Sequence, residues 1–375
     1  MKDIGIHIPE NDNLEKILLK QKDISFPPYK KERSEKSYLT RYKDIKLALE
    51  QINNSVEKLV MVNELEKYID EKDNLPDNEF KEKLWTALIY LNNHGKGHVQ
   101  KVIEKVSDML SFFSFGDLTP YEMFILLCAI QVHDTGNAFG REKHENSIAR
   151  ILDSECSKIL PDKFERNLIE RIATVHCGEI YGDEDTISRL SVSSPMYNHN
   201  IRERLLAALL RFGDELADDC TRTDRYALQS GKLPKCSMIF HYYSQSLHTV
   251  SIIENQNNRE LQLELKYDFD LNVAKMKFYR CGKEKYLLDE IYDRTIKMEK
   301  ERRYCTRFLR PYFYLACIKV DIKITDVKYA MNSKDISYIL EEEGYPNVEI
   351  LIKNRLSGDE LVHIFEHKNE GEKNE

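Results

Sequence analysis

The sequence predicts a mainly α protein in which a helical bundle at 84–228 is followed by a smaller α+β accessory domain at 232–366. In the central part of the chain, apolar residues recur at three- and four-residue steps, which is the period of a helix. Past Gly231, apolar and polar residues alternate, which is the period of a strand. The chain has 375 residues, which is longer than a chain built around a single hydrophobic core usually is, so more than one domain is expected.

The two ends of the chain are expected to lie outside these domains. Residues 1–83 predict an irregular leader, interrupted by Pro9 and the Pro27-Pro28 pair, and then a helical lead-in with apolar residues at helical steps from about Ser37. Residues 367–375 are mostly charged and are expected to form a disordered tail.

The bundle begins with an apolar stripe that starts directly after His98 and continues to Phe113. Thr119-Pro120-Tyr121-Glu122 then combines a capping residue, a proline and a glutamate in the order typical of a helix start. The helix that follows is apolar all round, which predicts burial, and it is expected to present His133 and Asp134 at its end, where Gly136 can stop it. Further helices are predicted at 164–176 and 201–219.

The accessory domain is expected to contain antiparallel strands and one long charged helix. The helix is predicted at 286–309, and a short helix with two strands at 333–366. The other predicted strands are 237–243, 247–253, 261–267 and 315–324.

Composition narrows the class of protein. The net charge of −8 argues mildly against a general affinity for nucleic acid backbones. No apolar run is long enough to span a membrane, and the start of the sequence lacks the apolar region of a signal peptide. The eight cysteines are dispersed and form no Cys-x-x-Cys pair, so free thiols in a reducing, cytoplasmic compartment are expected.

Histidines gather in the predicted bundle, where each lies at the beginning or end of an apolar helix. Neutral imidazoles together with carboxylates are a ligand set for Mn²⁺, Fe²⁺, Co²⁺, Ni²⁺ or Zn²⁺. A single histidine on a helix is more often a hydrogen-bonded core or surface residue. Helix ends in a bundle converge on a common pocket, however, so the group as a whole indicates a metal site. Its histidines are His94, His98, His133, His144 and His176.

This ordered set resembles the HD-domain superfamily of metal-dependent phosphohydrolases. His98-Val99-x-x-Val102 is similar to the first helix of that family, and Val132-His133-Asp134-x-Gly136 to its signature pair. His144 and His176 resemble the further histidines of members that hold two metals, and Asp214 resembles the closing aspartate. The resemblance covers about 84–228. Within the superfamily, the stretch at 210–219 resembles most closely an HD subgroup of bacterial conflict and defence systems.

The resemblance implies one or two divalent ions, for which Mg²⁺ joins the candidates above. One ion would be held by His98, His133, Asp134 and Asp214. A second would share Asp134, whose two oxygens allow it to bridge, and would be held by His144 and His176.

Other residues are expected to act on the substrate. His94 resembles the histidine that acts as general acid in cyclic-nucleotide phosphodiesterases, and the alternative is a residue that supports a ligand or caps the helix. Arg141, Arg222 and Arg225 are candidates to bind phosphate, because a guanidinium offers it two parallel donors, and the alternative is a solvated helix face.

The function implied is hydrolysis of a phosphoester bond in a nucleotide or a nucleotide-derived signal. Cys177-Gly178-Glu179 after His176 replaces the Gly-Tyr-Pro motif of the branch that acts on cyclic di-GMP, which argues against that substrate. One alternative is a nuclease for single strands, served by Arg303, Arg307 and Arg310 at helical spacing, with nucleic acid as a less favoured partner. Another is a non-catalytic sensor whose metal pocket binds a nucleotide and whose accessory domain relays the event to a partner protein.

Overall fold

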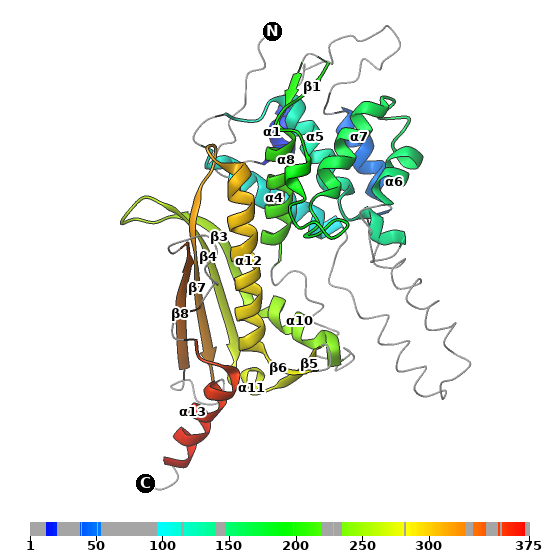
Figure 1. Ribbon diagram of the computed structural model, residues 1–375. Helices are drawn as coiled ribbons and strands as arrows, with labels where there is room; N and C mark the ends of the chain where they lie inside the picture. The colour runs from blue at the N-terminus through cyan, green and yellow to red at the C-terminus, as the bar shows by residue number, and fades with distance from the viewer. Residues whose placement is uncertain are drawn as a thin grey trace, which may run out of the picture. The chain divides into compact units, whose positions relative to one another are not determined.

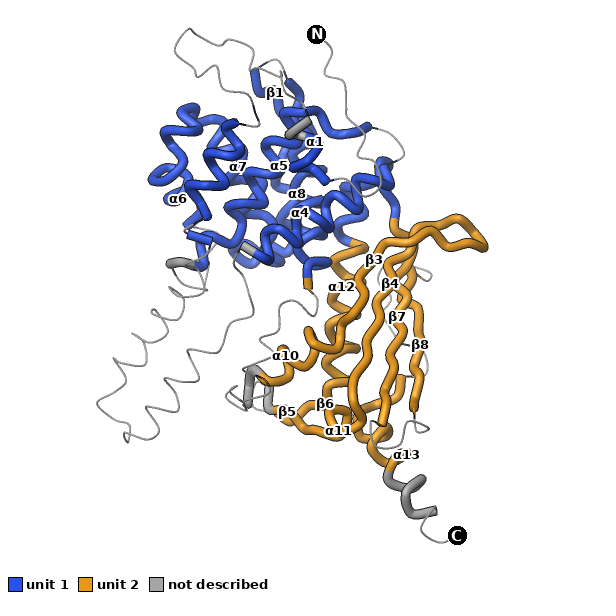
Figure 2. The backbone as a smooth tube through the Cα atoms, turned by 180° about the vertical axis from the view of Figure 1, so that it is seen from behind, with its two compact units in different colours: residues 1–87, 93–217, 304–314 blue, residues 88–92, 218–303, 315–375 orange. Residues whose placement is uncertain are grey.

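The chain forms two compact units, which Figure 2 distinguishes by colour. The first comprises residues 1–87, 93–217 and 304–314, and the second comprises 88–92, 218–303 and 315–375. The computed structural model describes residues 13–20, 38, 40–50, 52–53, 96–113, 116–139, 147–197, 199–218, 228, 235–280, 283–326, 333–342, 352 and 355–371. The protein is mainly α with some strands, as the sequence predicts.

The first unit is a bundle of helices with one short hairpin. Helix α4 packs on α5 and α8, while α7 packs on α5, α6 and α8. The helices of this unit are α1 (Leu14–Lys20), α4 (Lys96–Ser111), α5 (Pro120–Val132), α6 (Ile148–Glu155), α7 (Lys163–Thr174) and α8 (Glu203–Leu216), with short 3-10 helices η2 (Thr135–Phe139) and η4 (Ile187–Arg189) and strands β1 (Ser194–Met196) and β2 (His199–Ile201).

Helix α5 is the most buried element of the bundle, and the predicted start is confirmed. The Thr119 side chain accepts from the backbone of Glu122, and the Glu122 carboxylate accepts from the backbone of Thr119, so both groups of the capping box are present. All residues of α5 after Pro120 are buried, which the absence of a polar face requires. The end of the helix differs from the prediction. Helix α5 ends at Val132, before Gly136, and Gly136 itself lies within η2, where the backbone N–H of Asn137 donates to Asp134 O at 3.0 Å.

The beginning of α8 is fixed against the beginning of α5. Arg202, the residue before α8, donates from its backbone N–H at 3.1 Å and from Nε at 2.8 Å to Glu122 Oε1. Glu122 is fully buried, so this charge-assisted pairing offsets the cost of its desolvation. The predicted helices at 164–176 and 201–219 both end earlier than expected, at Thr174 and Leu216.

The second unit contains a four-stranded sheet with the order β3-β4-β7-β8. Neighbouring strands are antiparallel except β4 and β7, which are parallel and joined through the long helix α12. The elements of this unit are α10 (Lys235–Ser246), β3 (Leu247–Glu254), β4 (Leu261–Asp270), α11 (Leu271–Ala274), β5 (Lys277–Arg280), β6 (Lys283–Tyr286), α12 (Leu287–Leu309), β7 (Leu315–Thr325), β8 (Ser333–Glu341) and α13 (Gly358–Gly371).

Helix α12 lies along one face of this sheet in both views (Figures 1 and 2). Thr295 of α12 hydrogen-bonds Tyr338 of β8 at 2.9 Å between hydroxyl oxygens, and the Tyr292 ring lies 5.5 Å from the Tyr338 ring. The buried Arg302 donates to Leu315 O at the start of β7. From Tyr304 onward, the same continuous helix belongs to the first unit.

One expectation about the accessory part is wrong. Residues 237–243 are helical, because the buried Ile239 and Tyr243 follow a four-residue step and share one helix face. The predicted antiparallel strands 247–253 and 261–267 are confirmed as β3 and β4, whereas β7 runs parallel to β4 because α12 supplies a crossover. Helix α13 extends into the predicted tail as far as Gly371.

Among the residues that the structure describes, none of the helices combines the length and the apolar character needed to cross a membrane.

Candidate metal centre

His98 enters the candidate site from the first turn of α4. Its side chain is buried, although the residue before it, Gly97, is exposed. Its Nε2 lies 2.9 Å from Asp214 Oδ1 and 3.6 Å from Asp134 Oδ2. The first turn of α4 therefore brings one imidazole against carboxylates from two other parts of the chain.

His133 and Asp134 follow α5 directly. The Nδ1 atom of His133 lies 2.8 Å from Ile130 O in the last turn of the helix. A carbonyl oxygen can only accept, so Nδ1 carries the proton and donates to it. Nε2 is the nitrogen left to face the site, where it lies 3.5 Å from Asp134 Oδ2 and 3.7 Å from Asp214 Oδ1.

His176 lies two residues beyond the end of α7 and repeats this arrangement. Its Nδ1 lies 2.6 Å from Ala173 O, so its Nε2 is also directed to the site. Nε2 lies 3.9 Å from Asp134 Oδ1, and the His176 ring is nearly perpendicular to the His133 ring at 5.1 Å between centroids.

The two oxygens of Asp134 have different neighbours. Oδ2 faces His98 and His133, whereas Oδ1 faces His176 and accepts a hydrogen bond from Asn137 Nδ2 at 3.1 Å. Each oxygen of this carboxylate therefore faces a different set of histidines, as in a carboxylate that bridges two metal ions.

Asp214 belongs to the last turn of α8, and its side chain is 29% exposed. The close approach of α8 to α4 depends on the preceding residue, Gly213. A Cβ atom on Gly213 would lie 2.5 Å from Val106 Cγ2 on α4. The missing side chain thus lets the helix that carries Asp214 lie directly on the helix that carries His98.

Charge in the site couples the histidines to the aspartates. Burial by itself lowers the pKa of His133, but the carboxylates of Asp134 and Asp214 outweigh it and raise this pKa to about 9. Burial likewise opposes the charge on Asp214, yet contacts with His133 and His98 hold the pKa of its carboxyl well below the usual range. The carboxylates of Asp134 and Asp214 therefore favour positive charge in the site.

The residues present fit a divalent ion. Ligand atoms of His98, His133 and Asp134 all lie within 4.8 Å of one another. His133 Nε2 is buried and makes no hydrogen bond to any described residue, and it faces the two carboxylates at distances too long for a good one. Metal–ligand bonds of about 2.1 Å place two ligands of the same ion about 3–3.5 Å apart, close to the separations seen here.

The structure brings together five of the predicted metal ligands, namely His98, His133, Asp134, His176 and Asp214. The other predicted site residues lie outside the described part of the chain, and these are His94, Arg141, His144, Arg222 and Arg225.

Sequence reasoning assigned no role to Asn137, which holds Asp134, or to Arg211, which contacts the segment after His176. For Asn137 a signal exists, since it lies three positions after Asp134, as in one turn of a 3-10 helix. Arg211 contacts Cys177 O, 34 positions earlier, and no local pattern indicates such a contact.

The bundle and its converging histidines and aspartates define an HD-type domain. A family model described as HD-CE matches residues 79–297, more than half of the chain, and the chain therefore belongs to this family. The predicted membership of the HD superfamily is thereby confirmed, while the conflict-and-defence subgroup stays a prediction. No curated protein and no solved structure gives a significant match to the chain.

Proposed function

We propose that the protein is a metal-dependent phosphohydrolase that cleaves a phosphoester bond in a nucleotide or a nucleotide-derived signal. The observation that carries the proposal is the buried His133 Nε2, which faces two carboxylates without a hydrogen bond among the described residues. Membership of the HD-CE family supports it. A buried imidazole nitrogen packed against two carboxylates is a position that a divalent cation can occupy in place of a proton.

One divalent ion would be held by His98, His133, Asp134 and Asp214. A second would share Asp134 and be held by His144 and His176. When bound, the ions lower the pKa of a coordinated water and neutralise charge on the phosphate oxygens. The different neighbours of the two Asp134 oxygens support this division. Nitrogen and oxygen ligands together suit Mn²⁺, Fe²⁺, Co²⁺, Ni²⁺ or Zn²⁺ better than Mg²⁺.

The protein's own groups would orient the ligands. Ile130 O and Ala173 O fix the tautomers and ring planes of His133 and His176, so that each Nε2 offers a lone pair to the site. Asn137 fixes the rotation of the Asp134 carboxylate. Of the residues expected to act on the substrate, His94 would donate a proton to the leaving oxygen, and Arg141, Arg222 and Arg225 would bind phosphate.

The nuclease alternative is weaker than the sequence alone indicates. Arg303 donates to Glu299 Oε1 at 2.6 Å and to Glu341 O at 2.8 Å. Arg307 pairs with Asp185 Oδ2 at 3.3 Å. These guanidinium groups are already engaged within the protein, which leaves less of the predicted basic face for a nucleic acid backbone.

The test is a metal-dependent activity screen. Chelator-treated protein is resupplied with Mn²⁺, Co²⁺, Ni²⁺, Zn²⁺ or Mg²⁺ and offered nucleotides, cyclic dinucleotides and short oligonucleotides. We expect hydrolysis of at least one nucleotide only when metal is present, and loss of both metal and turnover in Asp134→Asn.

The matched control is Asp153→Asn on α6, whose 59% exposed carboxylate pairs with Arg166. It makes the same change of charge away from the site and should keep both metal and turnover. Full activity in Asp134→Asn would exclude this site. Hydrolysis confined to oligonucleotides would favour the nuclease, and nucleotide binding without turnover in the presence of metal would favour the sensor.

A further inference from the structure

His176 is followed by an irregular segment, whereas His98 and Asp214 lie within helices and His133 and Asp134 lie between α5 and η2. His176 itself follows α7, and the irregular segment, 177–186, leads to η4. Within its own turn, the backbone N–H donates to Ala173 O at 3.3 Å, and Nδ1 contacts the same oxygen. These bonds fix the imidazole relative to the end of α7. They do not fix the end of α7 relative to Asp134 and Asp214.

Thr186 joins the far end of this segment to both neighbours of His176. Its buried hydroxyl lies 3.0 Å from Val175 O and 3.3 Å from Cys177 O. A hydroxyl has a single proton, so it donates to one of the two carbonyl oxygens at a time. The backbone on either side of His176 is therefore held by one side chain that comes from ten residues further along the chain.

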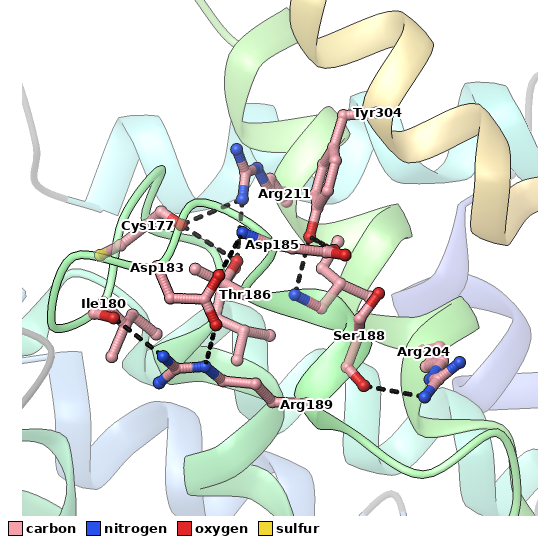
Figure 3. Close-up of polar contacts among 12 residues, drawn as sticks. Cys177, Ile180, Asp183, Asp185, Thr186, Ser188, Arg189, Arg204, Arg211 and Tyr304 are labelled. Carbon is pink, nitrogen blue, oxygen red and sulfur yellow. Dashed lines mark hydrogen bonds and ion pairs between the residues drawn. The ribbon is translucent and has the colours of Figure 1, made fainter.

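Arg211 connects the same segment to α8. Its Nη1 donates to Cys177 O at 3.0 Å and to Thr186 Oγ1 at 2.9 Å, and Figure 3 shows its guanidinium directed at both. Arg211 is buried and lies three residues before Asp214, within one helical turn. The helix that carries the candidate ligand Asp214 thus binds the carbonyl group of the residue after the candidate ligand His176.

Tyr304 supports this arrangement from the end of α12 that belongs to the first unit. The guanidinium carbon of Arg211 lies 4.5 Å from the centre of the Tyr304 ring. The Tyr304 hydroxyl accepts from Ile187 N at 2.8 Å and donates to Asp185 Oδ1 at 3.0 Å (Figure 3). One tyrosine therefore holds the arginine and also the residues on both sides of Thr186.

We propose that Arg211 and Tyr304 are positioning residues for His176, and that they set the occupancy of the second ion. The inference rests on the proposed function, because it assigns His176 to a metal. A ligand that precedes an irregular segment reaches binding geometry only if its supports hold it to within about 0.5 Å. Arg211 provides this support because one planar guanidinium contacts two acceptors and stacks on a ring, which a lysine ammonium cannot do.

The test is a metal titration that needs no substrate. Metal-stripped full-length protein is titrated with Mn²⁺, and free Mn²⁺ is followed by its EPR signal. In the wild type we expect two binding steps, of which His176→Ala abolishes the weaker. Arg211→Lys should weaken that step about 10- to 100-fold, the usual effect of removing the support of a metal ligand. Tyr304→Phe, a milder change, should weaken it about 2- to 10-fold by removing two hydrogen bonds.

Arg204→Lys is the matched control. Arg204 lies on the same helix and donates to Ser188 O at 2.8 Å, as Figure 3 shows, and to Leu190 O at 2.7 Å, so it binds η4 and the residue after it. It should lower the melting temperature as Arg211→Lys does, yet leave both binding steps unchanged. In a His176→Ala background, Arg211→Lys should cause no further change in metal binding, because it acts through His176.

The outcomes separate this inference from the proposed function. If Arg211→Lys binds Mn²⁺ like the wild type, or Arg204→Lys weakens it equally, the positioning role is wrong. If His176→Ala leaves the titration unchanged, the inference fails, while the hydrolase proposal stands on His98, His133 and Asp134. If both steps respond as expected but no phosphoester is cleaved, the inference stands and the hydrolase proposal fails. A wild type that binds no Mn²⁺ would exclude both.

Discussion

Gly213 lies so close to Val106 that a Cβ atom on the glycine would approach Val106 Cγ2 to 2.5 Å. The contact joins α8 to α4 one residue before Asp214 and two turns after His98. Val106 is fully buried, and a β-branched side chain has few rotamers to adopt, so it cannot move aside cheaply. The 2.9 Å separation of His98 and Asp214 therefore depends on a residue that offers no ligand.

Gly213→Ala should accordingly damage the site through packing. The added methyl group should push α8 away from α4, lower stability by about 1–3 kcal/mol and weaken metal binding. Thermal unfolding and metal titration measure the two effects. Val106→Ala removes the opposing Cγ2, so the double variant should bind metal better than Gly213→Ala alone. Metal affinity equal to wild type in Gly213→Ala would show that the helix spacing does not control the site.

Local signals in the sequence predict the elements of the bundle and the candidate ligands at their ends. The capping box at Thr119 and Glu122 and the apolar stretch that follows place α5, and α5 places His133 and Asp134. Short apolar runs are less decisive, because alternation over seven residues fits both a strand and one face of a helix. Residues 237–243 show this ambiguity and form α10.

The supports of the site could not be predicted from local patterns. Gly213 is needed only because Val106 lies opposite, and Arg211 is needed only because the segment after His176 returns to α8. Both requirements arise from contacts between residues that are more than thirty positions apart in the sequence. The ligands are residue types with recognisable chemistry, whereas their supports are defined by what they touch.

Metal binding near neutral pH should release a proton. Without metal, the carboxylates of Asp134 and Asp214 raise the pKa of His133 to about 9, above the ordinary value of 6.5. At pH 7–8 an incoming ion must therefore displace the proton on Nε2. Calorimetric titration in buffers of different ionisation enthalpy should show this release, and metal affinity should fall as the pH is lowered. Identical heats in all buffers would contradict it.

The same pKa determines how the stability of the metal-free protein changes with pH. Because folding raises the pKa of His133, its protonated form stabilises the folded protein. This stabilisation is complete below about pH 6.5 and is lost as the pH rises through about 9. The melting temperature of chelator-treated protein should therefore fall between pH 7 and 9.5. His133→Asn should show a smaller fall over this range, because it has no proton to lose.

Asn137 should control metal affinity through Asp134. Asn137→Ala removes the hydrogen bond from Nδ2 to Oδ1, which frees the carboxylate to rotate away from His98 and His133. We expect metal binding to weaken about 10-fold, as for other residues that orient a ligand. Asn200→Ala, at an exposed position on β2, makes the same change away from the site and should have no effect. Equal affinities in all three proteins would leave Asn137 with a role in folding alone.

His94→Ala should lower turnover and preserve metal binding, since we propose His94, four residues before His98, as the general acid. The expected loss is about 10²–10⁴-fold on an ordinary phosphoester, because the leaving oxygen then departs without a proton. The loss should shrink on a nitrophenyl ester, because nitrophenolate departs without protonation. His248→Ala, at an exposed position on β3, is the matched control and should be as active as the wild type. An equal loss on both leaving groups would make His94 a structural residue, and a loss of bound metal would make it a ligand.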